Sequence, residues 1–345
     1  MLQAIGEEAR QRASELAGER VQTIYFGGGT PSLLSVEEIN GLLQTLAAHY
    51  ALSEDMEITL EANPDDLQSL DYLRALRGDT PVNRLSIGLQ SFVPADLAYM
   101  NRAHSADEAA RCLENAAATG FDNLSVDLIY GTPTLSDADW RGNLQRVFEH
   151  KIQHLSCYAL TVEPKTALAQ HVKTQKVAPP DEEQAARQFE ILLAETAAAG
   201  FEQYEISNFC RPPHYARHNT AYWQGKKYVG LGASAHSYDG QRRRWNIANN
   251  ALYTRAVLGG ASYWEEELLT ESDVFNETLM TALRTRWGLT QERMAAFSAA
   301  QRAHFEREAA PYVQRGLLLR EAAGYRLSDA GKLLADTILA DLFIA

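Results

Sequence analysis

Val21-Gln-Thr-Ile-Tyr-Phe-Gly-Gly-Gly-Thr-Pro-Ser32 is the stretch that decides the fold. Its first half, residues 21–26, is an apolar run that predicts a buried strand. The run leads straight into the triple glycine 27–29. A triple glycine is most often a tight turn, but it also lets the backbone approach a ligand closely.

Similar apolar runs follow at the spacing of βα repeats. They are residues 57–61, 84–89, 124–130 and 154–160. The stretches between them carry helix start signals that resemble capping boxes, at Ser35, Ser105 and Ser136, and two of the helices are expected to end at Gly120 and Gly200. Apolar strands that alternate with helices predict a parallel sheet covered by helices.

Polar residues stand at the carboxyl ends of successive predicted strands. They are Gly27–Thr30, Glu61, Gln90, Asp127 and Thr161. Barrel enzymes take one or two groups from each strand at this face, whereas open sheets concentrate ligands at one switch point. The pattern therefore favours a barrel or partial barrel over a doubly wound sheet.

The pattern changes after about residue 205. Tyr-, Trp- and Gly-rich loops are expected to residue 248, followed by helices near 273–286 and 291–315. The segments 316–319 and 325–328, with a helix from Asp329, indicate a small helix–hairpin–helix module that could take a winged-helix shape. The simplest interpretation of this module is a packing domain.

Charge and hydropathy exclude several classes of protein. The net charge of −13 argues against binding to nucleic acid, which relies on clustered Lys and Arg. The cluster Arg242–Arg244 is expected to be a solvated loop rather than a ligand site. No stretch approaches the ~20 apolar residues of a membrane span, and residues 2–17 lack a signal-peptide core, so we expect a cytoplasmic protein without a stable membrane anchor.

Three cysteines, Cys112, Cys157 and Cys210, lie far apart in the chain. Cys112 falls on a predicted helix and Cys157 on a predicted strand, where small buried hydrophobic residues are usual. No C-x₂-C or C-x₃-C spacing is present to hold zinc or an iron–sulfur cluster. The sequence therefore predicts no thiolate metal site in this chain.

Singly, the strand-end residues are weak signals, because Asp127 could be a satisfied buried carboxylate and Glu61 could cap the following helix. Together they present backbone, carboxylate and amide groups in strand order. This set suits a ligand that combines an amino acid with a ribose.

Five motifs resemble those of the radical S-adenosylmethionine proteins in the oxygen-independent coproporphyrinogen oxidase group. They are Gly27-Gly-Gly-Thr-Pro-Ser32, Leu60-Glu-Ala-Asn-Pro64, Asn83 to Phe92, Asn101-Arg-x-His104 and Asp127-Leu-Ile-Tyr-Gly131. Within that group, Tyr204–Asn208 and Arg217-His-Asn-Thr-Ala-Tyr-Trp223 resemble the HemW-like haem chaperones. The resemblance covers nearly the whole chain, including Gly230–His236 and the final module.

The resemblance implies an α/β fold, with a partial (β/α)₆ barrel over residues 1–235 and a small, mostly helical, winged-helix-like domain over 236–345. It also implies an S-adenosylmethionine site. Backbone of Gly28, Gly29 and Thr30 would meet the methionine ammonium, with Glu61 as counter-charge. Arg102 could grip the methionine carboxylate in a bidentate manner, and Gln90 and Asp127 would take the ribose hydroxyls.

The resemblance further implies that His218 is an axial ligand of haem iron, with Tyr222 and Trp223 stacking on or flanking the porphyrin. The plainer alternative is that His218 hydrogen-bonds within a loop that closes the barrel. His214 and His236 are the next candidates for the haem ligand.

The chain departs from the family in two places. Gly131-Thr-Pro133 stands where relatives usually have Gly-Leu-Pro. Relatives also begin with a strand and a C-x₃-C-x₂-C loop that binds a [4Fe–4S] cluster. Met1 of this chain instead corresponds to a position midway through the helix that follows this loop. We therefore expect the first strand to be missing. A late-assigned start is the simpler explanation, and a cluster is expected only if the missing segment is present.

The leading interpretation is a haem-binding chaperone that delivers haem to haem-dependent respiratory proteins. The alternatives are an oxygen-independent coproporphyrinogen III oxidase and a degenerate, non-catalytic scaffold. Whether the chain is an enzyme stays open, because it lacks the C-x₃-C-x₂-C motif that radical catalysis requires. Without a cluster, we expect no reductive cleavage of S-adenosylmethionine.

Overall fold

The structure, a computed structural model, describes residues 1–344. The chain divides into two compact units. Unit 1 contains Met1–Thr23, Glu37–Met56 and the chain from Arg217 onward, and unit 2 contains Ile24–Val36 and Glu57–Ala216. Strands β1 (Val21–Phe26) and β2 (Leu52–Ala62) each contribute residues to both units. The division into domains at residue 235 stays a prediction.

The main sheet has the order β1-β2-β3-β4-β5-β7-β6. Its further strands are β3 (Arg84–Gln90), β4 (Leu124–Tyr130), β5 (His154–Ala159), β6 (Glu202–Gln203) and β7 (Asn208–Cys210). Strands β2 to β5 pair in parallel, and β7 joins β5 in the antiparallel sense. Because each of the first five strands lies beside its predecessor in the chain, the order is that of a barrel and lacks the switch point of a doubly wound sheet.

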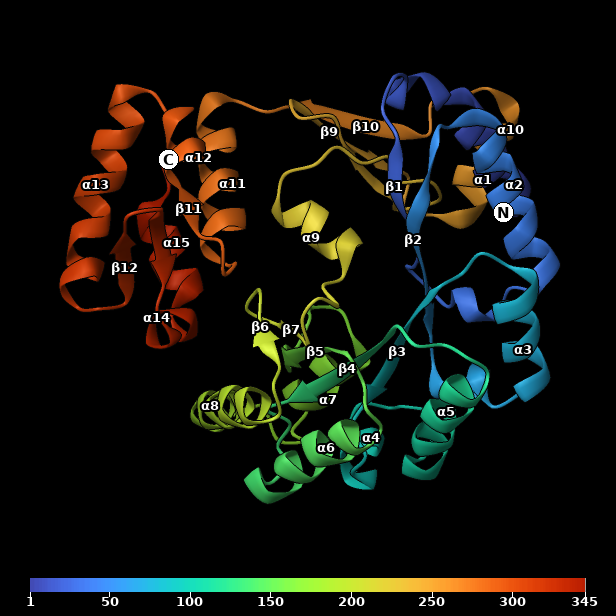
Figure 1. The fold of residues 1–345 in the computed structure, drawn as a ribbon, viewed down its shortest axis with the longest axis horizontal. Helices are drawn as coiled ribbons and strands as arrows, with labels where there is room; N and C mark the ends of the chain where they lie inside the picture. The colour runs from blue at the N-terminus through green and yellow to red at the C-terminus, as the bar shows by residue number, and fades with distance from the viewer. Residues whose placement is uncertain (345) are drawn as a thin grey trace. The chain divides into compact units, whose positions relative to one another are not determined.

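Helices connect the strands of unit 2 and cover the sheet (Figure 1). They are α3 (Leu70–Asp79), α4 (Pro94–Tyr99), α5 (Ala106–Ala118), α6 (Asp137–Glu149), α7 (Ala167–Lys173) and α8 (Glu182–Ala198), with 3₁₀ turns at Pro31–Leu33 and Pro64–Leu67. The predicted capping box at Ser105 is present, and Ser136 accepts a hydrogen bond from the Asp139 amide. The strands of the sheet contain fully buried residues, among them Leu60, Leu85, Ile87, Val126, Leu128 and Leu155.

Unit 1 contains α1 (Leu2–Gln11), a 3₁₀ turn at Ala13–Leu16, and most of α2 (Val36–His49). It also contains α9 (Arg217–Trp223), β8 (His236–Tyr238), β9 (Arg242–Asn246), α10 (Asn250–Gly259) and β10 (Trp264–Leu268). The three strands form an antiparallel sheet in the order β10-β9-β8. Helix α9 and the strands β8 and β9 lie where the sequence predicted loops.

The basic run is one correction to the sequence analysis, because Arg242–Arg244 lie on β9 and not in a solvated loop. The neighbouring strand β10 is acidic, and Arg244 faces Glu266 in the ladder. Arg244 contacts Glu266 at 3.7 Å, and Arg243 contacts Glu277 at 2.8 Å. Neutralisation by the adjacent acidic residues lets three consecutive arginines form a strand.

Within unit 1, helix α1 is held to its neighbours by the carboxylate of Glu8, which is fully buried. Its Oε1 accepts hydrogen bonds from Asn246 (2.7 Å) and Arg12 (3.1 Å), and its Oε2 accepts them from the Gly232 amide (2.8 Å) and the Tyr253 hydroxyl (2.5 Å). Four donors around one carboxylate satisfy a charge that would otherwise be costly to bury.

The last part of unit 1 is a module with the element order of a winged helix. It comprises α11 (Glu271–Leu283), β11 (Leu289–Thr290), α12 (Gln291–Ala295), α13 (Ala299–Gln314), β12 (Leu318–Glu321), β13 (Gly324–Leu327), α14 (Asp329–Leu333) and α15 (Ala335–Leu342). The strands pair in the order β11-β13-β12. The predicted small, mostly helical domain is therefore present, although the expected helix over 291–315 is divided between α12 and α13.

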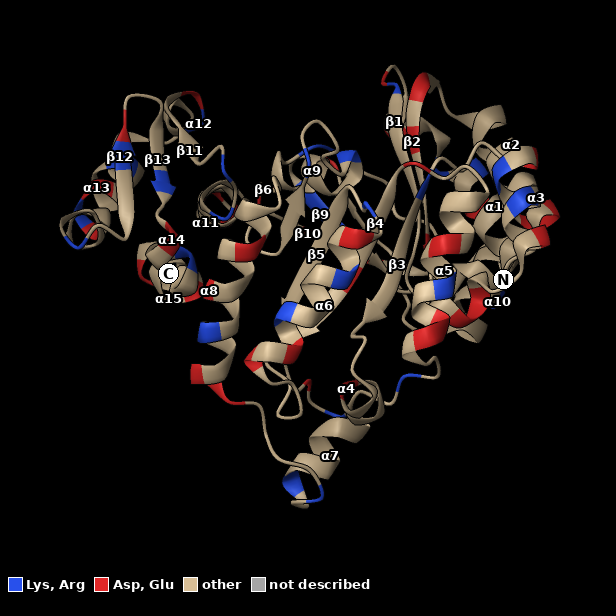
Figure 2. Ribbon diagram, turned by 60° about the horizontal axis from the view of Figure 1, so that its bottom comes forward, with Lys and Arg blue, Asp and Glu red and all other residues tan. Residues whose placement is uncertain are grey.

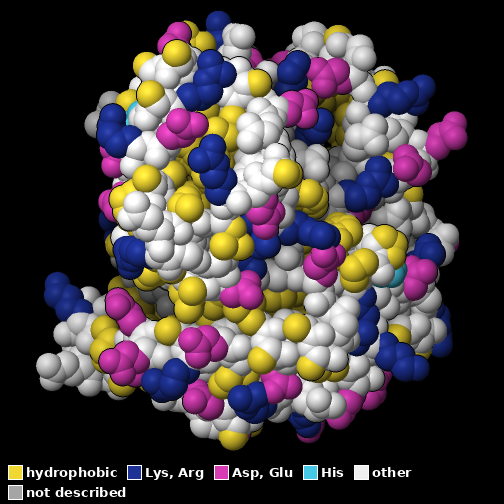
Figure 3. Space-filling view, turned by 60° about the vertical axis from the view of Figure 1, so that its left-hand side comes forward, with side chains coloured by type: hydrophobic (Ala, Val, Ile, Leu, Met, Phe, Trp, Pro, Cys, Tyr) yellow, Lys and Arg dark blue, Asp and Glu magenta, His cyan; other side chains and the backbone are white. Residues whose placement is uncertain are grey.

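Charges of both signs are distributed along the helices (Figure 2). The face drawn in Figure 3 likewise carries interspersed acidic and basic side chains. Within residues 1–344, no helix is both long enough and apolar enough to cross a membrane.

Candidate functional site

The glycine loop after β1 meets a carboxylate at the end of β2. Glu61 Oε2 accepts a hydrogen bond from the Gly28 amide at 3.1 Å, and Oε1 accepts one from the Tyr25 hydroxyl at 2.5 Å. Glu61 therefore bonds to the loop, in place of the helix-capping role considered from the sequence. Tyr25 lies two residues before the triple glycine, but nothing in the sequence pattern indicated its contact with Glu61.

The loop conformation requires glycine. Gly28 and Gly29 have φ values of 71° and 123°, which favour residues without a side chain. A Cβ on Gly27 would lie 2.5 Å from the Tyr25 ring, whereas one on Gly28 or Gly29 would have nothing within 4 Å. The space beside Gly28 and Gly29 is open and could admit a ligand.

Arg102 lies at the carboxyl ends of β2 and β3. Its Nη2 donates hydrogen bonds to Asn63 Oδ1 (2.7 Å) and to the Gly88 carbonyl (3.2 Å). Its Nε is buried and has no hydrogen-bond partner within the described chain. Burial lowers the pKa of Arg102, opposed by attraction to Asp65 and Asp127. An unused buried donor is costly, and a bound acceptor would satisfy it.

Gln90 ends β3 with a φ of 67°, beside a break in the register between β3 and β4. Its side-chain amide lies 2.8 Å from the position that a Cβ on Gly88 would take. A bulge of this kind redirects a side chain at the end of a strand.

Asp127 is half-buried on β4. Burial raises its pKa from 3.8 to about 6, opposed by a hydrogen bond from Ser156 and by the charge of Arg84, while Glu61 raises it further. Asp127 also contributes to the raised pKa of Tyr25, after burial and Glu61. Tyr25, Glu61, Asp127 and Arg102 thus form one electrostatically coupled group in unit 2.

Thr30 closes the loop through its carbonyl, which accepts a hydrogen bond from the Leu33 amide at 3.2 Å. Thr161, the other polar strand-end residue, lies beyond β5, and its hydroxyl donates to Glu163 at 3.3 Å. Thr161 therefore interacts locally with the following loop.

These residues fit the chemistry of S-adenosylmethionine. Glu61 supplies a negative charge for an ammonium group, and the buried Arg102 Nε supplies an unused donor for a carboxylate. Asp127 and Gln90 can accept hydrogen bonds from hydroxyl groups. The open space beside Gly28 and Gly29 adds room at the loop.

The described residues do not fit a [4Fe–4S] cluster. Cys112, Cys157 and Cys210 are all buried thiols without a disulfide. Burial raises the pKa of Cys112 to about 12 and also raises that of Cys157. No group of three His, Cys, Asp or Glu side chains that could hold a metal ion occurs in residues 1–344.

His218 lies in unit 1 on the short helix α9. Its Nδ1 lies 2.8 Å from Thr23 Oγ1 on β1, and its Nε2 lies 3.1 Å from the Tyr222 hydroxyl. The His218 and Tyr222 rings meet edge to face at 4.9 Å, and Tyr222 meets Tyr228 at 4.6 Å in the same way. The side chain thus makes the hydrogen bonds of the plainer alternative, but on a helix and not in a loop.

The other residues of the predicted haem site lie nearby in sequence. Trp223 has a buried Nε1 without a hydrogen-bond partner among residues 1–344, and the Arg284 guanidinium lies 5.9 Å from the centre of its ring. His214 is exposed, and so is His236, whose ring lies tilted with its centre 6.5 Å from that of Trp245. A half-buried imidazole held at Nδ1 by a hydroxyl fits an axial haem ligand, because metal-bound histidines usually hydrogen-bond through the other ring nitrogen.

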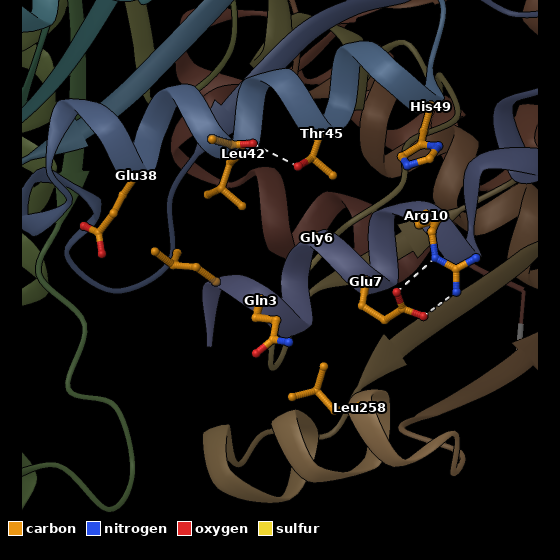
Figure 4. Close-up of a pocket in the computed structure, with 11 residues that line it drawn as sticks. Gln3, Gly6, Glu7, Arg10, Glu38, Leu42, Thr45, His49 and Leu258 are labelled. Carbon is orange, nitrogen blue, oxygen red and sulfur yellow. Dashed lines mark hydrogen bonds and ion pairs between the residues drawn. The ribbon is translucent and has the colours of Figure 1, made fainter.

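A groove of about 660 Å³ lies between α1, α2 and α10 in unit 1. Figure 4 shows Gln3, Glu7 and Arg10 of α1 opposite Leu42 and Thr45 of α2, with Leu258 of α10 below them. Arg10 and Glu7 pair with each other at 2.5 Å. No residue of either predicted site lines this groove.

The comparisons with known proteins decide the family. The Radical SAM superfamily model matches residues 5–147, and the HemN C-terminal domain model matches residues 269–334. The chain is 37% identical over 344 residues to a protein of Mycobacterium tuberculosis (strain ATCC 25618 / H37Rv) named Heme chaperone HemW, covering 99% of this chain and 85% of that one. The chain belongs to the HemW family.

A further relative agrees with this assignment, and a solved structure agrees with the fold. The HemW of Bacillus subtilis (strain 168) is 31% identical, with 98% of this chain and 89% of that protein covered. The solved structure of coproporphyrinogen III oxidase (HemN) from Escherichia coli, described as a Radical SAM enzyme, has a TM-score of 0.83 at 25% identity and covers 99% of this chain and 82% of that one. The predicted radical SAM fold is therefore confirmed.

Proposed function

We propose that this chain is a haem-binding chaperone of the HemW type, which holds haem through His218 and passes it to a haem-dependent protein. The observation that supports this most is the near full-length identity of 37% to a HemW haem chaperone. The geometry of α9 agrees with it, because Thr23 holds one nitrogen of the His218 ring. Tyr222 and Trp223 follow on the same helix and offer aromatic surface for a porphyrin.

The proposal includes a second site in unit 2 for S-adenosylmethionine, the cofactor that the superfamily implies. Glu61 would meet the ammonium group beside the backbone of Gly28 and Gly29, and Arg102 would meet the carboxylate. Gln90 and Asp127 would take the ribose hydroxyls. With its cluster, such a site supplies radical chemistry, whereas the residues of this chain bind and orient the ligand.

A coproporphyrinogen III oxidase is the second candidate, favoured by the structural likeness to HemN at a TM-score of 0.83. Fold alone does not fix activity. The two functions differ in a direct assay, because only the oxidase would consume coproporphyrinogen under anaerobic reducing conditions. The recipient of haem and the cytoplasmic location stay predictions.

Haem titration tests the proposal. We expect the 345-residue chain to bind haem in a 1:1 ratio with a Soret band typical of a protein ligand, and we expect His218→Ala to lose that band. His214→Ala and His236→Ala are the matched controls and should bind as the unmodified chain does. If a control variant loses the band while His218→Ala keeps it, the haem ligand is the histidine that was replaced in that control.

A further inference from the structure

Both ring nitrogens of His218 lie at hydrogen-bond distance from hydroxyl groups. Thr23 Oγ1 lies 2.8 Å from Nδ1, and the Tyr222 hydroxyl lies 3.1 Å from Nε2. Tyr222 follows His218 by four residues on α9, so the helix brings the two side chains together. A metal ion can bind only a nitrogen whose lone pair is available.

The two hydroxyls are not equivalent. A neutral imidazole has one N–H group and one nitrogen with a lone pair. Burial raises the pKa of Tyr222 to about 12, but its phenol is still more acidic, and therefore a better donor, than the aliphatic hydroxyl of a threonine. The favoured arrangement therefore has Tyr222 donating to Nε2, while Nδ1–H donates to Thr23.

The position of Tyr222 is supported from one side and open on the other. Its ring meets Tyr228 edge to face at 4.6 Å, and Tyr228 exchanges backbone hydrogen bonds with Tyr238 at 2.9 and 3.0 Å. Yet 41% of Tyr222 is exposed. The side chain can therefore turn toward solvent without opening the core.

We propose that Tyr222 caps the iron-binding nitrogen of His218 in the haem-free chain and must leave it when haem binds, while Thr23 holds the ring in the ligating tautomer. This inference rests on the proposed function, haem ligation by His218. When haem binds, Tyr222 would give up its hydrogen bond to Nε2, and the lone pair of that nitrogen would then be available to hold the iron. The phenol keeps its proton, and no electron is transferred.

Removal of the capping Tyr222 hydroxyl should raise the affinity for haem. A hydrogen bond of this kind contributes a net of about 0.5–1.5 kcal/mol, so Tyr222→Phe should raise haem affinity about two- to tenfold while the ring remains. Tyr99→Phe is the matched control, because its hydroxyl bonds to the Ala178 carbonyl in unit 2. Its haem affinity should not change.

Removal of the Thr23 hydroxyl, which holds the His218 ring, should have the opposite effect on haem affinity. Thr23→Val keeps the shape of the side chain and removes the hydroxyl. Removal of an outer partner of a metal-bound histidine typically costs about 10–100-fold in affinity. We expect Thr23→Val to weaken haem binding, so the two hydroxyl deletions should move affinity in opposite directions.

Nitrogen-15 NMR of the haem-free chain supplies a readout that is independent of haem. The His218 ring should show the tautomer protonated at Nδ1, and Tyr222→Phe should shift its Nε2 resonance. A ring protonated at Nε2, or a Tyr222→Phe variant that binds haem no better than the unmodified chain, overturns the cap. If His218→Ala then still abolishes binding, the proposed function stands without it, whereas unchanged binding in His218→Ala overturns both.

Discussion

At the scale of single residues, Asp127 is a half-buried carboxylate whose pKa is shifted by its surroundings. Burial raises its pKa to about 6, although Ser156 and Arg84 favour the charged form. Between about pH 4 and 6 the folded chain therefore holds a proton at this site that the unfolded chain has released. Its contribution to the free energy of unfolding is largest at low pH and falls as the pH rises through about 6.

Substitution of Asp127 should change this pH dependence. Asp127→Asn removes the ionisation and should raise the free energy of unfolding at about pH 7.5 by about 1–3 kcal/mol, with little effect near pH 4. Thermal unfolding of both chains across this range measures the difference. The exposed Asp122→Asn is the control, and a parallel pH dependence in the Asp127→Asn chain and the unmodified one would show that the carboxylate is already charged at low pH.

At the scale of elements, α1 is held by a buried carboxylate and not by its apolar residues alone. Glu8 joins α1 to the Gly232 loop, β9 and α10 through its four hydrogen bonds. Its neighbour Glu7 instead pairs with Arg10 at the surface. Two adjacent glutamates on one helix therefore have very different energetic roles.

This contrast gives a matched pair of variants. Glu8→Ala leaves Arg12 and three other donors without their buried acceptor and should lower the free energy of unfolding by about 3–5 kcal/mol. Glu7→Ala should lower it only slightly, since exposed ion pairs contribute little. Urea unfolding compares the two, and equal effects would contradict the anchoring role of Glu8.

Element prediction succeeded where a strand is a continuous apolar run. Val21–Phe26 and Leu124–Tyr130 have the predicted bounds. The strand β2 begins at Leu52, five residues before the prediction, because its first part is polar and gives no apolar signal. The strand β9 was missed because its arginines pair with Glu266 and Glu277, which are distant in sequence.

Site prediction from sequence has a similar limit. Strand-end polarity predicted Glu61 and Gln90 as site residues, and they lie at the ends of β2 and β3, whereas Asp127 lies in the middle of β4 and not at its end. The roles of Tyr25 and Asn63 depend on side-chain contacts to Glu61 and Arg102, which no local pattern encodes. The hydroxyl on each nitrogen of His218 was likewise visible only in the fold.

At the scale of the whole molecule, residues 1–344 contain the candidate residues for S-adenosylmethionine but no group of thiolates that could hold a cluster. Reductive cleavage of S-adenosylmethionine requires an electron source, which the buried, separated cysteines do not provide. We expect the 345-residue chain, incubated anaerobically with S-adenosylmethionine and dithionite, to form no 5′-deoxyadenosine. Chromatography of the reaction checks this, and stoichiometric product would contradict the expectation.

The function proposed for the whole molecule is the transfer of haem. The most direct test loads the chain with haem, mixes it with a haem-free b-type cytochrome domain, and follows the Soret band of the acceptor. The account predicts transfer from the loaded chain, and no loading, hence no transfer, with His218→Ala. A chain that binds no haem, or that keeps its haem when the acceptor is in excess, would contradict a haem chaperone.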